Sequence, residues 1–354
     1  MIDMCMSAVP NIKSGQIQTL TNRIIVEGTN FGLPTNPMAF WDEASTLKQD
    51  YPMSNTIPLV RWGEVHSMAF SNLTTVPNRS GKNDTVYYGK GGHSCLLQPK
   101  FKTGLIYDKL YISWWYRNNQ DPSSEGDSNK FIRIWDEYSG YGTRISWTHM
   151  HLTCANGTYW NSWTKYGKIN AWNHHEFYAD LANDRVIATL NGKTMFNVTC
   201  SKDSAQAGRP IFVRLIGFDN GSDHYKNMTT ALDSVFIGNS AKRLVLAHVP
   251  TFGQIELSEV VPIDEWNSNR IVARWIEGVL DWTKPIYAYV VDENGNFNSQ
   301  GYLLSVVSEN VISSNDNGGI LRNCTNCESS GNNMQSFVCL RTFAILMIII
   351  FIFQ

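Results

Sequence analysis

The stretch from Trp172 to Phe196 constrains the fold of this chain more than any other. Its first half alternates between two faces, as an extended strand does, because successive side chains of a strand point to opposite sides. Asp184 to Leu190 is a second run rich in β-branched residues, and Asn191-Gly192 follows it directly. This dipeptide favours a tight hairpin turn, since both positions need positive φ angles. The stretch therefore predicts consecutive strands joined by tight turns.

The sequences WNHHEFYADL and DRVIATLNGK within this stretch resemble the middle strands of concanavalin A-like lectin and glucanase jelly rolls, which include laminin-G-like and pentraxin-like domains. Further strands are expected at residues 110–117, 131–136, 145–152 and 211–218. LDSVFIGNS, from Leu232, resembles the closing strand of such a jelly roll. The resemblance implies an all-β jelly-roll sandwich over residues 44–247.

Both flanks of this region also have β-sandwich patterns. NRIIVEGTNFG, from Asn22, resembles the opening of IPT/TIG domains, which are immunoglobulin-like modules. Residues 248–307 contain strand runs at sandwich spacing and resemble the closing half of such a module. We therefore expect residues 11–43 and 248–307 to form two parts of one small sandwich, with the jelly roll inserted between them. A separate C-terminal sandwich is the alternative.

The C-terminal region has a different composition. Residues 308–341 are rich in Asn, Ser and Gly and are expected to be disordered. Residues 342–354 form a hydrophobic tail, whose eleven-residue apolar run covers only about 16 Å as a helix, against a hydrocarbon core of roughly 30 Å. Small residues and a spacer precede it, as in a GPI-attachment signal. A hydrophobic segment without a role is the alternative. The first fifteen residues contain no apolar segment typical of a secretory signal peptide.

Charge and sequons narrow the class of protein. The formal net charge of -2 provides no basic field for nucleic acid, so we expect no nucleic-acid partner. Seven cysteines suit disulfide formation outside the cell, with the pairing left open. Asn-x-Ser/Thr sequons fit a secreted glycoprotein. The glycosylation candidates are Asn72, Asn78, Asn83, Asn156, Asn197, Asn220 and Asn227, and an eighth sequon begins at Asn323.

Arginine, histidine and tryptophan side chains fall on the faces of several expected strands and would line one groove if these strands are neighbours. Aromatic rings stack on sugar rings, while Arg and His donate hydrogen bonds to hydroxyls or carboxylates. The pattern thus predicts carbohydrate binding, although strand histidines can also be purely structural. The candidate ligand-binding residues are Arg133, Trp135, Trp147, His149, His151, Trp115 and Arg117.

Enzymatic activity has weaker support in the sequence. Jelly-roll glucanases carry an E-x-D-x-E or E-x-D-x-x-E motif, and this chain has neither. A polysaccharide lyase needs one group to neutralise a uronate carboxylate and another to take the C5 proton. Arg133 would serve the first task and His149 or His151 the second, but the motifs of jelly-roll alginate lyases are absent.

No cofactor is expected. Asp292-x-Asn294-x-Asn296 resembles the start of a calcium loop, but lacks its glycine and final glutamate, so a hairpin turn is the simpler interpretation. Asp219 and Asp223 lie in a loop of the kind that holds calcium in lectin-like folds, and nothing further supports a metal there. We therefore predict an extracellular or cell-surface, non-catalytic carbohydrate-binding protein with polysaccharide or glycoprotein glycans as partners. The alternatives are a lyase acting on an acidic glycan and a structural surface or adhesion module.

Overall fold

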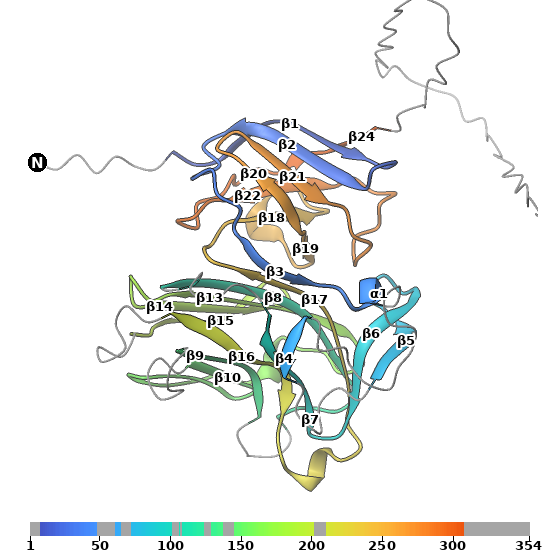
Figure 1. The fold of residues 1–354 in the computed structure, drawn as a ribbon, viewed down its shortest axis with the longest axis vertical. Coiled ribbons are helices and arrows are strands. Elements are labelled where there is room, and N and C mark those ends of the chain that lie inside the picture. Colours follow the sequence, from blue (N-terminus) through green and yellow to red (C-terminus); the bar gives the residue numbers. More distant parts are fainter. Residues whose placement is uncertain are drawn as a thin grey trace, which may run out of the picture. The chain divides into compact units, whose positions relative to one another are not determined.

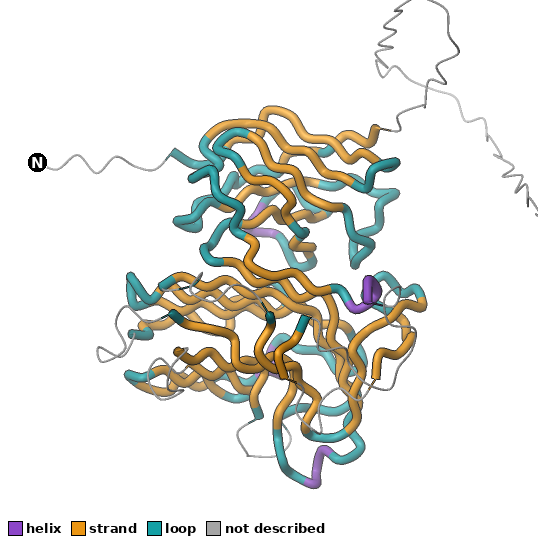
Figure 2. The backbone as a smooth tube through the Cα atoms, in the orientation of Figure 1, coloured by secondary structure: helices purple, strands orange, loops and turns teal. Residues whose placement is uncertain are grey.

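The computed structural model describes residues 8–47, 61–64, 72–100, 106, 108–123, 129–136, 145–201 and 210–307. Residues 1–309 form one compact unit, within which the described strands build two β-sandwiches (Figure 1). Strands dominate the described residues, and helices are limited to short turns (Figure 2). The predicted all-β class is therefore confirmed. The helical turns are α1 (Ala44–Leu47), η1 (Trp163–Lys165), η3 (Asp223–Tyr225) and η4 (Phe252–Gln254).

The larger sandwich has a seven-stranded sheet of order β12-β11-β10-β9-β16-β7-β4. Its strands are β4 (Trp62–Glu64), β7 (His93–Pro99), β9 (Lys130–Asp136), β10 (Ile145–Thr148), β11 (His151–Cys154), β12 (Gly157–Trp160) and β16 (Ile211–Asp219).

An eight-stranded sheet lies over it, with the order β15-β14-β13-β8-β17-β6-β5 and β3 paired to the end of β17 (Figure 1). Its strands are β3 (Met38–Asp42), β5 (Asn72–Pro77), β6 (Asn83–Lys90), β8 (Lys109–Asn118), β13 (Trp172–Asp180), β14 (Arg185–Leu190), β15 (Lys193–Thr199) and β17 (Thr229–Gly238).

Large aromatic side chains fill the space between these two sheets. On β8, Ile112, Trp114 and Tyr116 point inward, because they occupy alternate positions of the strand. Trp114 meets Trp147 of β10 edge to face at 5.9 Å and stacks on His175 of β13 at 5.0 Å. Full burial of such a side chain stabilises the fold by roughly 1.5–3 kcal/mol. The intervening residues of β8 must therefore lie on the outer face of the eight-stranded sheet.

A disulfide joins the two sheets at one edge. Cys154 ends β11 in the seven-stranded sheet, Cys200 directly follows β15 in the eight-stranded sheet, and their sulfurs are bonded. Cys95 of β7 is a buried free thiol. The other four cysteines lie outside the described residues.

The smaller sandwich combines both ends of the described chain. One sheet has the order β20-β21-β2-β1-β24, so β1 and β2 pair with strands more than 200 residues further along the chain. The second sheet has the order β19-β18-β22-β23. The strands are β1 (Asn11–Gln18), β2 (Arg23–Thr29), β18 (Arg243–Ala247), β19 (Ser258–Val260), β20 (Ile263–Trp266), β21 (Arg270–Arg274), β22 (Tyr287–Val291), β23 (Tyr302–Leu303) and β24 (Ser305–Val307).

Two predicted segment boundaries differ from the observed sheet membership. β3 precedes residue 44 but pairs with β17 of the larger sandwich. β18 precedes residue 248 but pairs with β19 and β22 of the smaller one. Both are short apolar runs, whose alternation gives the inward face of a strand but not the identity of its partner. The chain therefore leaves the smaller sandwich before residue 43 and returns to it before residue 248, in both cases earlier than the sequence predicts.

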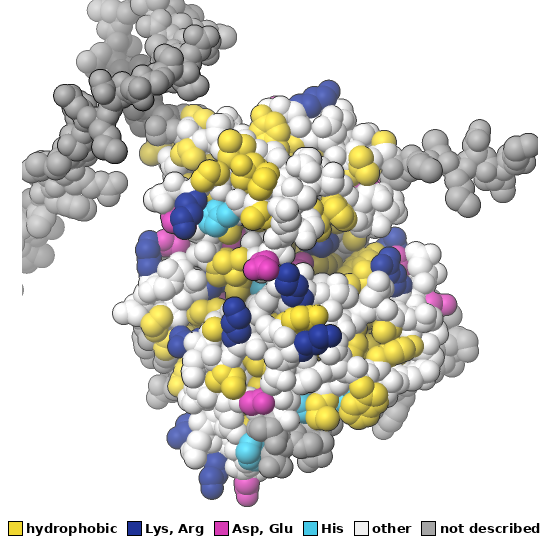
Figure 3. Space-filling model, turned by 180° about the vertical axis from the view of Figure 1, so that it is seen from behind, with side chains coloured by type: hydrophobic (Ala, Val, Ile, Leu, Met, Phe, Trp, Pro, Cys, Tyr) yellow, Lys and Arg dark blue, Asp and Glu magenta, His cyan; other side chains and the backbone are white. Residues whose placement is uncertain are grey.

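Basic and acidic side chains are interspersed on the face of the molecule that Figure 3 shows.

The short helices of the described residues include none with the length and apolar character of a membrane span. The predicted disordered segment 308–341 and the hydrophobic tail 342–354 lie outside the described residues.

Candidate functional site

Four side chains form a row on the outer face of the eight-stranded sheet. Trp172 of β13 lies opposite Arg117 of β8, which in turn lies opposite Ala231 of β17. Ala231 also lies opposite Tyr88 of β6. Directly opposed residues of antiparallel strands point to the same face. The Trp172–Tyr88 row therefore places an indole, a guanidinium, a methyl group and a phenol side by side across four strands.

A pocket of about 220 Å³ opens over Arg117, Ala231 and Tyr88 of this row, and Trp172 lies beside its wall through a hydrogen bond to Pro77. Adjacent strands are about 4.8 Å apart, so the backbones of Arg117 and Tyr88 are separated by roughly 10 Å, with only the methyl group of Ala231 between them. The small side chain thus leaves the space that the two large ones flank. We call this space the Arg117 pocket; its lining residues are Val76, Pro77, Tyr88, Arg117, Asn118, Asn119, Asn170, Thr229 and Ala231.

Hydrogen bonds hold the walls of the Arg117 pocket in place. The carbonyl oxygen of Pro77 accepts from Nε1 of Trp172 at 3.1 Å and from Nη1 of Arg117 at 3.5 Å. The side-chain oxygen of Asn119 accepts from the backbone N–H of Thr229 at 2.7 Å. The pocket therefore combines half-buried aromatic and basic groups with amides and a hydroxyl. Such a lining can stack on an apolar ring face and form hydrogen bonds with its substituents.

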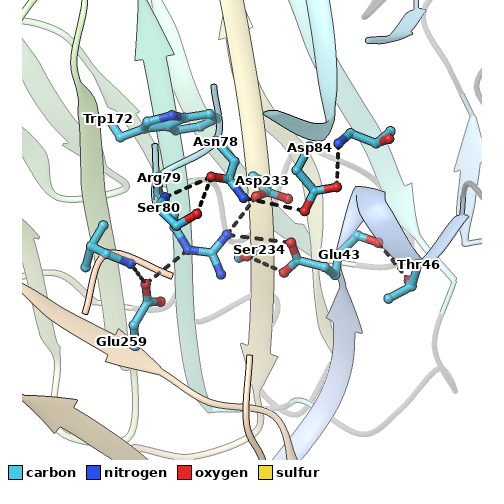
Figure 4. A network of polar contacts seen from close by, with 12 residues as sticks. Glu43, Thr46, Asn78, Arg79, Ser80, Asp84, Trp172, Asp233, Ser234 and Glu259 are labelled. Atoms are coloured by element: carbon cyan, nitrogen blue, oxygen red, sulfur yellow. Dashed lines mark hydrogen bonds and ion pairs between the residues drawn. The ribbon is translucent and has the colours of Figure 1, made fainter. Parts of the chain in front are cut away.

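The segment beyond Pro77 is anchored by a buried ionic network (Figure 4). Arg79 donates from Nε to Glu259 at 3.1 Å and from Nη1 to Asp233 at 2.7 Å, and Glu43 lies 3.6 Å from Nη1. The side chain of Arg79 has no exposed surface. Figure 4 shows Trp172 beside the segment that carries Arg79. The network thus fixes the segment whose Pro77 carbonyl binds Trp172 and Arg117.

Charge within this network is unbalanced, because three carboxylates surround one guanidinium. Burial disfavours the charged form of Arg79, but Glu259, Glu43 and Asp233 outweigh this effect and raise its pKa. Burial, followed by the charge of Glu43, raises the pKa of Asp233 well above its usual range. Asp233 therefore holds a proton under conditions in which an exposed aspartate is ionised.

The segment expected to be one strand, residues 145–152, is a hairpin. β10 ends at Thr148 and β11 begins at His151, and Oγ1 of Thr148 accepts hydrogen bonds from the N–H groups of Met150 at 3.3 Å and His151 at 3.0 Å. Such bonds from a threonine side chain favour a turn over a continuing strand. In a continuous strand over residues 145–152, alternation predicts that Trp147, His149 and His151 share one face, and the hairpin shows that this prediction is wrong.

The histidine and tryptophan candidates of this hairpin are separated. Trp147 points into the core and is fully buried. His149 is buried in the turn, and burial lowers its pKa to about 4. His151 is half-buried on β11, and its ring lies 4.8 Å from that of Trp160. These three residues do not form one groove.

The remaining candidates lie on two different sheets. Ser146 lies opposite both Arg133 and Thr153, and Thr153 is two residues from His151, so Arg133 and His151 share the outer face of the seven-stranded sheet. Trp115 is buried on the outer face of the other sheet and stacks on His174 at 4.7 Å. Arg117 lies in the pocket, and the side chain of Trp135 lies outside the described residues.

Trp172 and Tyr88 are not among the site residues that the sequence pattern predicts. Both residues lie in runs with strand character, and nothing in those runs marks either side chain as part of a site. Their proximity to Arg117 depends on strand order and register, which alternation does not contain. Asn119 and Asn170 lie in polar segments typical of loops, and nothing in the sequence marks their amides as part of a site.

The glycosylation candidates differ in exposure. Asn83, Asn156, Asn197 and Asn227 are exposed. Asn78 and Asn220 are buried, and their side-chain oxygens accept hydrogen bonds from nearby backbone N–H groups. A glycan needs an accessible amide nitrogen, so the four exposed asparagines are the better candidates. The side chain of Asn72 and the sequon at Asn323 lie outside the described residues.

The carboxylates considered for calcium have other partners. Asp292 accepts from the backbone N–H groups of Asn294 and Asn296, each at 2.8 Å, as in a side-chain-stabilised turn. Asp219 lies 2.7 Å from Nδ1 of His93. Within the described ranges, no group of three or more His, Cys, Asp or Glu side chains is placed to hold a metal ion.

No protein-family model matches this chain, and no curated protein matches it. Among solved structures it is similar to domain 4 of the extracellular arabinanase AbnA from Geobacillus stearothermophilus in complex with arabinotriose, with 16% identity and a TM-score of 0.28, covering 47% of this chain and 80% of that one. It is also similar to an alginate lyase from Corynebacterium sp., with 11% identity and a TM-score of 0.31, covering 63% and 98%.

A third similar structure is the binding domain of botulinum neurotoxin serotype D, with 10% identity and a TM-score of 0.32. This match covers 64% of the present chain and 66% of the neurotoxin chain, which is just under two thirds of its length. TM-scores of this size do not establish a common fold or function. The interpretation of the site therefore depends on its own geometry.

Proposed function

We propose that this chain is a non-catalytic carbohydrate-binding protein and that the Arg117 pocket holds the glycan. The observation that carries the proposal is the Trp172–Tyr88 row, in which two aromatic rings flank a guanidinium and a small alanine, with the pocket open over Arg117, Ala231 and Tyr88. Aromatic rings supply the flat apolar surface on which sugar rings stack. The asparagines and Thr229 supply hydrogen bonds for hydroxyl groups.

The lining of the pocket favours binding over hydrolysis. Glycoside hydrolysis usually needs two carboxyl groups, about 5 Å apart in retaining enzymes and about 6.5–9.5 Å apart in inverting ones. No aspartate, glutamate or histidine is among the described residues that line the pocket. Arg133 and His151, which could serve a lyase, share the outer face of the seven-stranded sheet and are not among the residues that line the Arg117 pocket, and His149 is buried in the turn between β10 and β11. The described lining of the Arg117 pocket thus provides neither the carboxyl pair of a hydrolase nor the histidine of the lyase alternative.

An extracellular or cell-surface location is part of the same proposal. The Cys154–Cys200 bond supports it, because structural disulfides persist mainly in oxidising compartments. The exposed sequons are compatible with glycosylation there. The hydrophobic tail at residues 342–354 would provide the signal for a lipid anchor. We also propose that the larger sandwich is a concanavalin A-like jelly roll and the smaller one an IPT/TIG-like domain, on the basis of the sequence resemblances and the paired sheets.

A glycan array probed with the intact chain tests the function. We expect binding to a restricted set of glycans, and we expect Trp172→Ala and Tyr88→Ala to weaken it at least tenfold. Trp160→Ala is the matched control, because Trp160 is 68% exposed and lies on β12 of the other sheet. A tenfold loss corresponds to about 1.4 kcal/mol, which is the size expected when a ring loses both the apolar area that it buries against the sugar and its stacking contact.

Two results would contradict the proposal. The first is unchanged binding by both pocket variants together with loss of binding by Trp160→Ala, which would place the site on the seven-stranded sheet. The second is a rise in ultraviolet absorbance when uronate polymers are incubated with the protein, because a lyase forms a conjugated C=C bond. Absence of binding to every glycan would leave the structural adhesion module as the better interpretation.

A further inference from the structure

Arg117 is the one charged residue among the described residues that line the pocket. Within the part of the chain that the structure describes, its one hydrogen bond is of 3.5 Å, to the carbonyl oxygen of Pro77. A guanidinium presents five N–H donors in a planar fork, so one long bond leaves most of its donor capacity for a ligand. Arg117 is also only half-buried, which keeps the fork within reach from the pocket.

The other arginines in the described part of the chain are a comparison for Arg117. Five of them pair with carboxylates of the chain: Arg61, Arg79, Arg243, Arg270 and Arg274. The strand neighbours of Arg117 are instead Trp172 and Ala231, and the rest of the pocket lining is neutral. The pocket therefore has a net positive charge with no carboxylate from its own lining to balance it.

We propose that the Arg117 pocket selects sugars that carry a carboxylate and that Arg117 is the specificity-determining residue. This inference rests on the proposed function and adds the class of ligand. A carboxylate accepts two parallel N–H bonds from a guanidinium, and such charge-assisted pairs are roughly twice as strong as neutral ones. Tyr88 lies across Ala231 from Arg117, where its ring can stack on a sugar whose carboxylate faces the arginine. A neutral sugar leaves the guanidinium without an anionic partner.

Sugar carboxylates have two common sources, uronates and sialates, and the experiment has one arm for each. Binding of trigalacturonate and of sialyllactose is measured by calorimetry, and each is compared with its own methyl ester. Esterification removes the negative charge and keeps the ring and its hydroxyl groups. For the wild-type chain, we expect at least one of the two acids to bind about tenfold more tightly than its ester, a difference of 1.4 kcal/mol. The arm with the larger ratio identifies the source.

Variants assign the selectivity to Arg117. Arg117→Gln should bind acid and ester equally, and Arg117→Lys should retain part of the preference, because it keeps the charge without the fork. Arg185→Gln is the matched control, since Arg185 is exposed on β14 of the same sheet and contacts only Asn197 among the described polar partners. Raising the salt concentration should weaken binding of the acid more than binding of the ester.

The outcomes separate this inference from the function on which it rests. Equal binding of acid and ester by the wild-type chain, with binding still lost in Tyr88→Ala, would overturn the selectivity and leave carbohydrate binding intact. A preference for the acid that persists in Arg117→Gln would overturn the role of Arg117. No binding of any sugar in these titrations or on the array would overturn both proposals. The comparison of acid and ester needs no variant, so it decides the selectivity even if Arg117→Gln fails to fold.

Discussion

Arg79 in the turn between β5 and β6 donates a hydrogen bond from Nε to Oε1 of Glu259 on β19, over 3.1 Å and 180 residues of sequence. Glu259 also accepts from the backbone N–H of Val279 at 2.6 Å. This contact ties the turn that carries Arg79 to a strand of the smaller sandwich, and that turn directly follows Pro77 at the end of β5. The wall of the proposed glycan pocket therefore depends on residues that lie far from it in sequence.

Replacing Arg79 should be strongly destabilising. Arg79→Met leaves Glu43, Asp233 and Glu259 buried without their cation, and removal of one partner from a buried ionic network typically costs about 3–5 kcal/mol. Urea unfolding followed by tryptophan fluorescence measures the loss. Lys82→Met is the matched control in the same turn, because Lys82 and Glu277 form a pair whose side chains are 67% and 50% exposed. Such a pair contributes about 0–1 kcal/mol. Equal unfolding free energies for the two variants would contradict the account.

Asp233→Asn should make the free energy of unfolding less sensitive to rising pH. Because burial and Glu43 raise the pKa of Asp233, the folded chain retains a proton that the unfolded chain releases near pH 4. Stability from this group is therefore present in acid and lost as the pH rises towards the folded pKa. Asn can accept from Arg79 and donate to Glu43 as the protonated acid does, without titrating.

Unfolding free energies between pH 4 and 8 test this sign. We expect the difference between Asp233→Asn and the wild type to move in favour of the variant as the pH rises. Asp264→Asn is the control, since Asp264 pairs with Arg274 at a site where both side chains are at least one-third exposed. A difference that moves in favour of the wild type with rising pH would show that Asp233 is ionised in the folded state.

His175 should contribute to acid unfolding. Its Nε2 accepts from Nε1 of Trp163 at 3.0 Å, and burial lowers its pKa to about 3. The unfolded chain takes up a proton near pH 6.5 that the folded chain excludes, so stability falls as the pH drops from about 6.5 towards 3, by on the order of 4 kcal/mol. His175→Gln keeps an acceptor for Trp163 and should flatten this part of the stability curve. An unchanged slope would contradict the burial of a neutral imidazole, and His224→Gln, at an exposed site, is the control.

The Cys154–Cys200 bond should stabilise the contact between the two sheets of the larger sandwich. Its removal in Cys154→Ser should lower the free energy of unfolding by about 2–4 kcal/mol. Non-reducing peptide mapping should recover the two cysteine peptides linked, while Cys95 should react with alkylating reagents only after unfolding, because it is buried. Linkage of Cys95 to either residue would contradict the structure.

The alternation of side chains predicted those strands in which no side chain interrupts the backbone hydrogen bonding. Residues 172–180 form β13, and Asn191 and Gly192 have the positive φ angles of 51° and 71° expected for the turn. Residues 145–152 did not follow their pattern, because the hydroxyl of Thr148 favours a turn in place of strand continuation. The alternation of side chains thus predicts which residues share a face of a strand. It does not predict where a side chain accepts hydrogen bonds from the backbone and ends the strand.

The site was less predictable than the fold, because it depends on which strands pair and in which register. Of the seven candidate ligand residues, Arg117 lines the pocket, and its neighbours Trp172 and Tyr88 come from strands whose pairing no local pattern specifies. Arg79 lies in the polar sequence NRSGKN, which has the composition of a surface turn. Its burial arises only when a distant strand brings Glu259 to it.

The central claim is that a glycan occupies the Arg117 pocket, and NMR of the tryptophan indole N–H groups tests it most directly. Trp172 donates this proton to Pro77, whose residue lines the pocket, and Trp160 lies on the other sheet. The two signals are assigned with Trp172→Phe and Trp160→Phe, and the best oligosaccharide from the array is then titrated in. We predict that the Trp172 signal shifts in a saturable manner while the Trp160 signal stays in place. A saturable shift of Trp160 with no change at Trp172 would contradict the account.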